Sequence, residues 1–509
     1  MASPRTYAVL AALAALISGF SLLRGIDPFD EGLILQAADR IADGQLPYRD
    51  FLYPYGPGQP FLLAGLQELF GPSLVVWRIV RLLVDVAVPL VVFALVRRDA
   101  PVPLALLAWL VAATAMAQPL SANPFPLALL FALLAVAAAT PDSLTWRRAA
   151  LAGALTGVAA AWRLDFAAYA AAACVAALLL RPDDRRRTAF AYLGALAGIV
   201  ALVYAPFFVA AGAGDAWDAL VAKSLREREF WTLPFPLSYD GGFGSPRELK
   251  DVLDYHVPLL LLIGTAVAVA ITVGRGLRER MPPWRWAAWV VLAGGFVQYL
   301  LSRTDPFHET PLIVALAVVL AACAAWALRT LDGRTRTIAA GVSVAILVLL
   351  ATAGTANRLS ALFSPPDLEP VDLPQADGVD AEPAEARALP DAVGLVQRLV
   401  PPDEPIHVVT RRSDLVRIGN PLFPFLAQRP TLLDRDFDLL TSTEAQQEVV
   451  AALRERDPRA VVRWNHPTTI RREENERGEP SGSRLLDQHL AREYRVEARY
   501  GWYEILVPR

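Results

Sequence analysis

The run PLIVALAVVLAACAAWAL at residues 311–328 contains eighteen residues and no charged side chain. As an α-helix it would be about 27 Å long, close to the ~30 Å hydrocarbon thickness of a bilayer. Ten further apolar runs lie near 5–23, 74–96, 101–118, 124–140, 149–162, 166–180, 188–211, 256–274, 286–301 and 337–356. The sequence therefore predicts an α-helical polytopic membrane protein with about eleven transmembrane helices.

The composition agrees with this fold class and excludes several others. Hydrophobic types make up 55% of the 509 residues and charged types 19%, against about 25% charged residues in soluble proteins. A net charge of -3 gives no excess of positive charge, so nucleic-acid binding has little support. Cys174 and Cys323 both lie in apolar runs, so no disulfide framework is predicted. Positive charge is almost entirely Arg, a bias typical of a GC-rich bacterial genome.

Arginine placement predicts the orientation in a bacterial plasma membrane. Arg-rich stretches recur at every second loop, and such loops are usually cytoplasmic. They lie at 97–98, 147–148, 181–187, 275–285 and 329–336. Eleven crossings then leave the N-terminus in the cytoplasm and the C-terminus outside.

Most of the polar sequence falls on the extracytoplasmic side. We expect a transmembrane domain at 1–356, a Pro- and acid-rich linker at 357–405, and a small extracytoplasmic α/β domain at 406–509. Strands are predicted at 406–410, at 460–464 and on both sides of 499–501. Thr441 and Glu444 have capping-box spacing before a helix. A further helix is predicted near 389–399.

The first outer loop opens with DPFDEGLILQAADRIADG at residues 27–44. Apolar residues after Glu31 follow a helical period, which predicts an amphipathic helix at the membrane interface. Asp30 stands where an N-cap is expected. Two interpretations of the Asp30–Glu31 pair stay open at this point: a helix cap in an acidic loop, or a carboxylate that accepts a proton from a reacting hydroxyl.

The loop resembles a known family. An amino-terminal span, the acidic Asp30–Glu31 pair, an interfacial helix, the turn YPYGPGQ at 53–59 and a second helix follow one another. This order is similar to the GT-C superfamily of polyprenyl-phosphate-sugar glycosyltransferases, including protein O-mannosyltransferases and lipid A aminoarabinose transferases. The resemblance covers most of the chain, although its motifs are short.

The resemblance implies inverting transfer of a sugar from a polyprenyl-phosphate donor to a cell-envelope acceptor, which could be a glycan, a lipid or a protein. Asp30 would be the general base, and Glu31 would orient it or bind substrate. Asp27 is a further substrate-binding candidate, or simply ends the preceding span. Related enzymes often carry a Lys in the turn, and this turn has none. Arg49, Tyr53 and Tyr55 are therefore candidates for contacting the phosphate.

Two other outer loops contain ionisable residues. WRLDF places Arg163 and Asp165 at a tight membrane hairpin, either as a snorkelling pair or as substrate ligands. SRTDPFHETP contains Arg303 and His308, which could bind the donor phosphate. Its Asp, His and Glu residues could instead hold a divalent metal, although their spacing matches no metal motif.

The outer segment 212–255 reads as a lid over the lipid donor or as a plain interfacial connector. The chain contains no Walker motif and no HExxH motif, so nucleotide-driven transport and zinc proteolysis lack support. A transporter or flippase of lipid-linked glycans remains the alternative function, and a non-catalytic envelope scaffold is a third. Charges clustered at one surface, without a visible repeat, favour the transferase.

Overall fold

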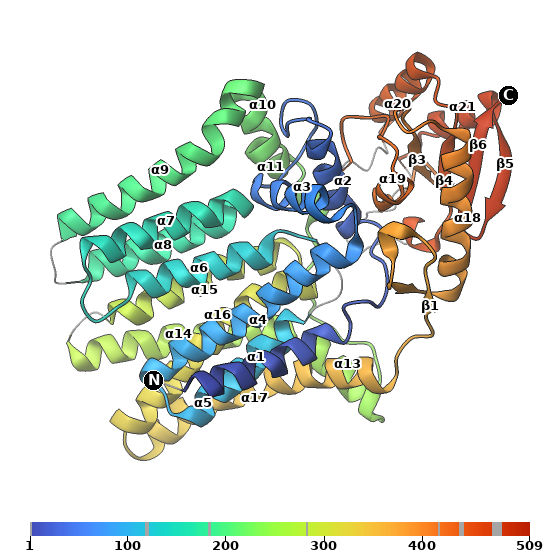
Figure 1. Cartoon of the computed structure of the whole chain (residues 1–509). Coiled ribbons are helices and arrows are strands. Elements are labelled where there is room, and N and C mark those ends of the chain that lie inside the picture. The colour runs from blue at the N-terminus through green and yellow to red at the C-terminus, as the bar shows by residue number, and fades with distance from the viewer. Residues whose placement is uncertain are drawn as a thin grey trace.

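The computed structural model describes residues 3–117, 122–181, 185–280, 283–415, 418–436, 442–470 and 481–509. A body of long helices carries a smaller α/β domain at one end (Figure 1). A helix occupies each of the eleven apolar ranges. These helices are α1 (Pro4–Gly19), α4 (Leu74–Asp99), α5 (Val102–Met116), α6 (Phe125–Ala139), α7 (Trp146–Trp162), α8 (Leu164–Leu180), α9 (Arg185–Ala211), α14 (Val257–Glu279), α15 (Trp284–Ser302), α16 (Pro306–Thr330) and α17 (Gly333–Phe363).

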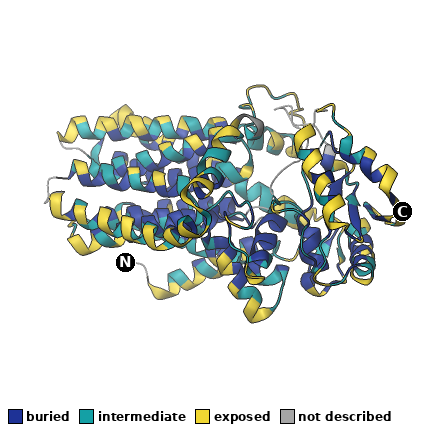
Figure 2. Cartoon of the chain, turned by 90° about the horizontal axis from the view of Figure 1, so that it is seen from above, coloured by how far each residue is buried: buried dark blue, intermediate teal, exposed yellow. Residues whose placement is uncertain are grey.

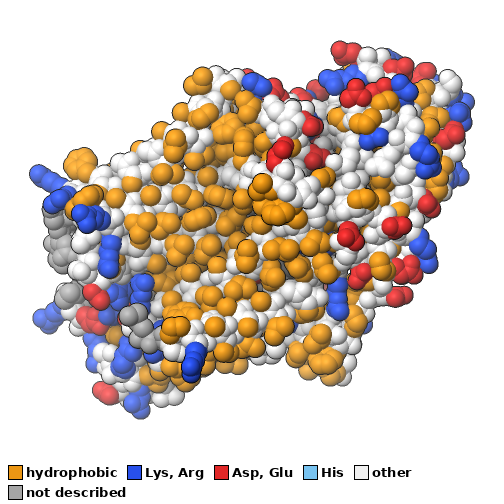
Figure 3. Space-filling view, viewed as in Figure 1, with side chains coloured by type: hydrophobic (Ala, Val, Ile, Leu, Met, Phe, Trp, Pro, Cys, Tyr) orange, Lys and Arg blue, Asp and Glu red, His pale blue; other side chains and the backbone are white. Residues whose placement is uncertain are grey.

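Five of these helices are long and apolar enough to cross a bilayer: α4, α14, α16, α17 and the part of α9 at Arg186–Ala211. Helices α1, α5, α6 and α8 are shorter and apolar. Hydrophobic side chains cover the middle of the helical body, and Lys and Arg gather at the end farthest from the α/β domain (Figure 3). These features support a multi-pass membrane protein, while the count of eleven crossings and the orientation stay predictions.

Helix α16 forms the centre of the bundle. Its most apolar window is 89% buried, whereas that of α9 is only 11% buried. Buried residues accordingly concentrate inside the body, and exposed ones lie along the outer helices (Figure 2). Glycines allow the outer helix α9 to pack closely on α7: a Cβ at Gly153 would meet the Tyr192 carbonyl oxygen at 2.1 Å. Small residues at helix contacts are typical of membrane bundles.

The C-terminal domain is built on a four-stranded sheet of order β3-β4-β6-β5. Strand β3 (His407–Thr410) pairs parallel with β4 (Val461–Trp464), and β6 (Tyr503–Pro508) pairs antiparallel with β4 and with β5 (Tyr494–Tyr500). The predicted strands are therefore present. Helices α18 (Pro383–Leu399), α19 (Leu422–Ala427), α20 (Thr443–Arg456) and α21 (Leu485–Glu493) accompany the sheet.

Two details differ from the expectations for this domain. Helix α20 is capped by Ser442, whose side chain accepts from the backbone N–H of Ala445, so the expected capping box is wrong. Thr441 itself lies outside the described residues. The stretch 357–405 was expected to be a linker with one helix near 389–399; that helix is present as α18, and the stretch also contains strands β1 (Glu369–Pro370) and β2 (Asp380–Ala381). Because α18 buries Leu389, Val393 and Val396, this stretch is folded onto the domain.

The first outer loop forms helices α2 (Asp30–Ala42) and α3 (Gly58–Phe70) at the end of the bundle (Figure 1). The C-terminal domain covers α2 through α19. A Cβ at Gly32 would lie 2.2 Å from the Leu422 backbone nitrogen, so only glycine permits this approach. Residues 31–38 of α2 are buried. The expected amphipathic helix is thus present, but protein covers it instead of an open membrane surface.

The second outer segment is largely helical. It contains α10 (Ala213–Trp217), the π-helix Asp218–Ala222, α11 (Lys223–Arg226), α12 (Arg228–Trp231) and α13 (Pro246–Tyr255). Helix α13 has a capping box between Ser245 and Glu248. Helices α10 and α11 lie beside α2 and α3 at the outer end of the bundle (Figure 1).

Candidate active site

A cavity of about 450 Å³ opens where the outer loops meet the C-terminal domain. Its walls come from the first outer loop, the α5–α6 connection, the α7–α8 turn, α11, α12, the α15–α16 junction and one residue of the C-terminal domain. The lining residues are Asp27, Phe29, Asp30, Pro54, Tyr55, Asn123, Arg163, Lys223, Ser224, Glu227, Arg228, Trp231, Thr232, Ser302, Arg303, Asp305, Phe307, His308 and Ile418.

Two carboxylates from the start of α2 face this cavity. Asp27 lies three residues before Asp30, and its Oδ1 accepts from the backbone N–H of Phe29, the N-cap of α2, at 3.1 Å and of Asp30 at 3.0 Å. Asp30 is the first helical residue, so its predicted role as N-cap is wrong. Burial and the neighbouring charges of Asp30 and Glu31 raise the pKa of Asp27 well above its usual value. Ionisation of Asp27 is therefore disfavoured relative to that of an exposed aspartate.

Glu31 is fully buried and does not line the cavity. Its carboxylate accepts from Trp77 Nε1 at 2.9 Å and from Arg78 Nε and Nη2, both at 2.8 Å. It also accepts from the backbone N–H of Asp27 at 2.9 Å. Glu31 thus ties the loop that carries Asp27 to helix α4, which is a positioning function.

Arg163 is held at the turn between α7 and α8, where it ends one helix and precedes the next. Its Nε and Nη2 donate to Asp165 at 3.0 and 2.8 Å, and Nη1 donates to the Tyr299 hydroxyl at 3.2 Å. The guanidinium also lies over the ring of Tyr55, 5.2 Å from its centroid. Since Asp165 does not line the cavity, it acts here as the partner that orients Arg163.

A second cationic group lies at the α15–α16 junction. Arg303 Nε donates to Asp305 Oδ2 at 2.8 Å, and His308 Nδ1 lies 2.7 Å from Asp305 Oδ1. The Tyr299 ring packs against His308 with centroids 4.4 Å apart. Burial alone would raise the pKa of Asp305, but His308 and Arg303 hold it below its usual value. Within the described ranges, no three His, Cys, Asp or Glu side chains are grouped as metal ligands.

The turn 53–59 contributes less than expected. Of its three candidates only Tyr55 lines the cavity. Arg49 is exposed and pairs with Asp50, with Nη2 and Oδ2 2.6 Å apart. Tyr53 is 3% exposed, and its hydroxyl makes no hydrogen bond to a described residue. The geometry therefore gives Arg49 and Tyr53 no direct contact with a molecule in the cavity.

The segment 212–255, expected to be a lid over the donor or a plain connector, forms part of the cavity wall through α11 and α12. Lys223 and Arg228 both line it, and Lys223 Nζ lies 2.5 Å from Glu227 Oε1. Lys223 is one of two lysines in the chain, which was an available signal, because the turn 53–59 lacks the lysine of related enzymes. Sequence reasoning did not single out Asn123, which lines the cavity and whose Oδ1 accepts from the backbone N–H of Phe125, the first residue of α6, at 3.1 Å.

No protein-family model and no curated protein sequence matches this chain. Among solved structures, ArnT from Cupriavidus metallidurans bound to undecaprenyl phosphate aligns over 99% of this chain and 98% of its own, with a TM-score of 0.55 and 16% identity. Arabinofuranosyltransferase AftD from Mycobacteria aligns over 99% of this chain and 42% of its own, with a TM-score of 0.53 and 16% identity.

The oligosaccharyltransferase of Archaeoglobus fulgidus in its apo form gives a TM-score of 0.50 at 14% identity, over 90% of this chain and 69% of its own. At these sequence identities the comparison shows the fold alone. The chain has the GT-C fold that the first outer loop predicted.

Proposed function

We propose that this chain is an integral membrane glycosyltransferase that transfers a sugar from a polyprenyl-phosphate donor to a cell-envelope acceptor. One observation carries the proposal: Asp27 and Asp30 share a single cavity with Arg163, Arg303 and further cations. A carboxylate facing a cationic pocket suits a reaction in which a hydroxyl loses a proton while a phosphate departs. The solved ArnT structure with the same fold, bound to undecaprenyl phosphate, supports a lipid-phosphate donor.

The cations would stabilise the leaving phosphate. Arg163 and Arg303 each keep one guanidinium edge on an aspartate, which fixes the direction of the group before substrate binds. Lys223 and Arg228 approach from α11 and α12 and would supply the charge that the lysine-free turn lacks. Because a phosphate so neutralised departs without protonation, the mechanism needs no general acid.

Asp30 would act as the general base. Asp30 lines the cavity as the first residue of α2, whereas the carboxylate of Asp27 already accepts from the backbone N–H groups of Phe29 and Asp30. The acceptor oxygen forms a bond to the anomeric carbon as the bond from that carbon to the phosphate oxygen breaks, and the hydroxyl proton passes to Asp30. Attack opposite the departing phosphate inverts the anomeric centre. Glu31 would serve by holding Asp27 and the start of α2.

We further propose that the cavity faces the extracytoplasmic side of a bacterial plasma membrane, with the N-terminus in the cytoplasm. The Arg-rich loops lie at the end of the body opposite the C-terminal domain (Figure 3), which supports this orientation by the positive-inside rule. The acceptor would then be a glycan, lipid or protein of the envelope.

The test is the Asp30→Asn variant, assayed in purified form with a radiolabelled polyprenyl-phosphate sugar and an envelope extract as acceptor. Loss of a general base typically lowers the rate by 10²–10⁴-fold, roughly, so release of polyprenyl phosphate should fall in that range. Asp43→Asn, an exposed change at the other end of α2, is the matched control. Near-normal release from Asp30→Asn would exclude Asp30 as the base. A lipid moved across the bilayer without cleavage would favour the transporter alternative.

A further inference from the structure

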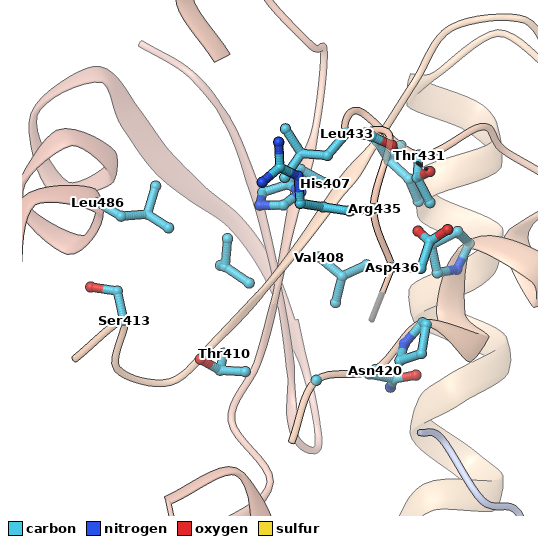
Figure 4. A pocket seen from close by; sticks show the side chains of 15 residues that line it. His407, Val408, Thr410, Ser413, Asn420, Thr431, Leu433, Arg435, Asp436 and Leu486 are labelled. Atoms are coloured by element: carbon cyan, nitrogen blue, oxygen red, sulfur yellow. Dashed lines mark hydrogen bonds between the residues drawn. The ribbon is translucent and has the colours of Figure 1, made fainter. Parts of the chain in front are cut away.

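A second cavity, of about 100 Å³, lies in the C-terminal domain beside strand β3. The side chains of His407, Val408 and Asn420 are among those gathered around it (Figure 4). None of the donor chemistry proposed above uses this cavity. It is large enough for several water molecules, which need only about 10–15 Å³ each on this measure.

The cavity lies along a sheet edge where Val408 makes no backbone hydrogen bond, among the described residues, on the side away from β4. β3 is the edge strand, and its neighbour β4 covers only one side. The N–H and C=O of Ile406 bond to Pro430 O and Leu432 N–H, both at 2.9 Å, on the other side. Since alternate residues of a strand point their backbone groups to the same side, those of Val408 and Thr410 face the cavity. Strand addition by a peptide would find only these two residues, which is too short an edge for a stable ladder.

Charges around the cavity are already compensated. Asp436 pairs with Arg40 of α2 at 2.9 Å, and Arg435 pairs with Asp434 and with Glu448, both at 3.1 Å. Burial lowers the pKa of His407 to about 4, so its ring is neutral at pH 7 and offers one donor and one acceptor. A ligand with a formal charge would find no free counter-charge here. A neutral molecule with many hydroxyl groups matches the available donors and acceptors.

The cavity adjoins the candidate active site through one short segment. Ile418 lines the active-site cavity, while Gly419 and Asn420 line the second one. Two peptide units separate Ile418 from Asn420, so their Cα atoms are at most about 7.6 Å apart. The two cavities are therefore lined by neighbouring residues of one segment.

We propose that the cavity beside β3 binds a non-reacting sugar unit of a neutral glycan acceptor and so directs the acceptor end into the active site. The inference rests on the proposed transferase function and specifies its acceptor as an uncharged saccharide chain. It also gives the C-terminal domain a role in acceptor recognition.

The first test fills the cavity. Gly419 lines the cavity, and a Cβ there would meet no described atom within 4 Å, so Gly419→Phe adds a bulky side chain at the cavity wall without a clash at its Cβ. The full-length protein in nanodiscs is titrated with mannohexaose, arabinohexaose and maltohexaose, and binding is followed by saturation-transfer NMR. We expect at least one neutral hexasaccharide to bind the wild type and Gly419→Phe to abolish that binding. Gly394→Phe on α18, where only the mobile end of Arg398 lies within 4 Å, is the matched control.

A second variant keeps the proposal testable if Gly419→Phe fails to fold. His407→Phe preserves ring volume and removes both hydrogen-bonding nitrogens, so the dissociation constant should rise about tenfold, the equivalent of one hydrogen bond. Asp30→Asn should bind the hexasaccharide like the wild type, which separates acceptor binding from catalysis. The proposal is overturned if no neutral hexasaccharide binds, if both cavity variants bind normally, or if only an extended peptide competes for the site.

Discussion

The buried ion pair between Glu31 and Arg78 makes the most quantitative prediction. The side chains of both residues are at most 1% exposed, and Glu31 accepts four hydrogen bonds in all. Glu31→Gln keeps the shape but leaves the Arg78 guanidinium without a counter-charge in an apolar surrounding. Breaking a buried pair in this way costs about 3–5 kcal/mol, and the retained amide oxygen places this variant near the lower value.

The same substitution should also reduce catalysis, because Glu31 fixes the backbone N–H of Asp27. We expect correct membrane insertion, a free energy of unfolding lowered by about 3 kcal/mol, and a loss of transfer even though Asp27 and Asp30 are intact. Unfolding is measured by denaturant titration in nanodiscs with tryptophan fluorescence, and transfer by polyprenyl-phosphate release. Glu68→Gln, an exposed position on α3, is the control.

A double variant separates charge from hydrogen bonding. Glu31→Leu with Arg78→Leu removes both charges, so it should be less destabilised than the sum of the two single variants. It still leaves the Leu22 and Gly25 carbonyls without the Arg78 donors, at about 1–3 kcal/mol each. The reasoning is refuted if Glu31→Gln unfolds within about 0.5 kcal/mol of the wild type and transfers sugar at the normal rate.

Three further substitutions probe the phosphate site, the domain contact and a titrating carboxyl. Arg303→Ala should raise the donor KM more than the acceptor KM, with Arg49→Ala, outside the cavity, as control; an unchanged donor KM would oppose the phosphate role. Gly32→Ala places a methyl 2.2 Å from Leu422 N, so it should cost about 1–3 kcal/mol and expose the C-terminal domain to limited proteolysis. Burial and Asp43 raise the pKa of Asp39 to about 8. The folded state thus binds the proton more tightly than the unfolded state does. The free energy of unfolding of the wild type should therefore fall between about pH 4 and 8, by at most ~1.4 kcal/mol per pH unit. Asp39→Asn should flatten this slope when unfolding is measured as a function of pH.

The helical body was predictable because the length of each apolar run can be read from the sequence. Each apolar run became a helix, and the α7–α8 turn occurs at Arg163 as expected. The stretch before the C-terminal sheet was less predictable. Proline and acidic residues favoured a linker around the helix predicted near 389–399, yet this helix begins at Pro383 and packs Ala386, Leu389, Val393 and Val396 into the domain. Pro383 stands in the first turn of α18, where a missing N–H costs nothing.

The sequence predicted which residues line the site better than it predicted which side chains contact one another. Asp30, Tyr55, Arg163, Arg303 and His308 come from four separate segments and line one cavity. Single-residue roles depended on partners that sequence patterns do not reveal.

Glu31 illustrates the limit of such patterns. Its partners Trp77 and Arg78 lie inside an apolar run that signals a span and nothing more. Likewise the N-cap of α2 is Phe29 and not Asp30, and the side chain of Asp27 accepts from the backbone N–H groups of Phe29 and Asp30.

The C-terminal domain is built into the site and is not an appendage. The backbone of Gly25 donates to Asp380 O at 2.7 Å, two residues before Asp27, and Leu422 N–H donates to Pro28 O at 3.1 Å. The carboxylate loop is thus held between α4 on one side and the C-terminal domain on the other. These backbone contacts fix the position of the C-terminal domain relative to the loop before Asp30. They would therefore also fix the position of an acceptor bound by that domain relative to Asp30. Loosening the domain should then impair the chemical step itself as well as acceptor affinity.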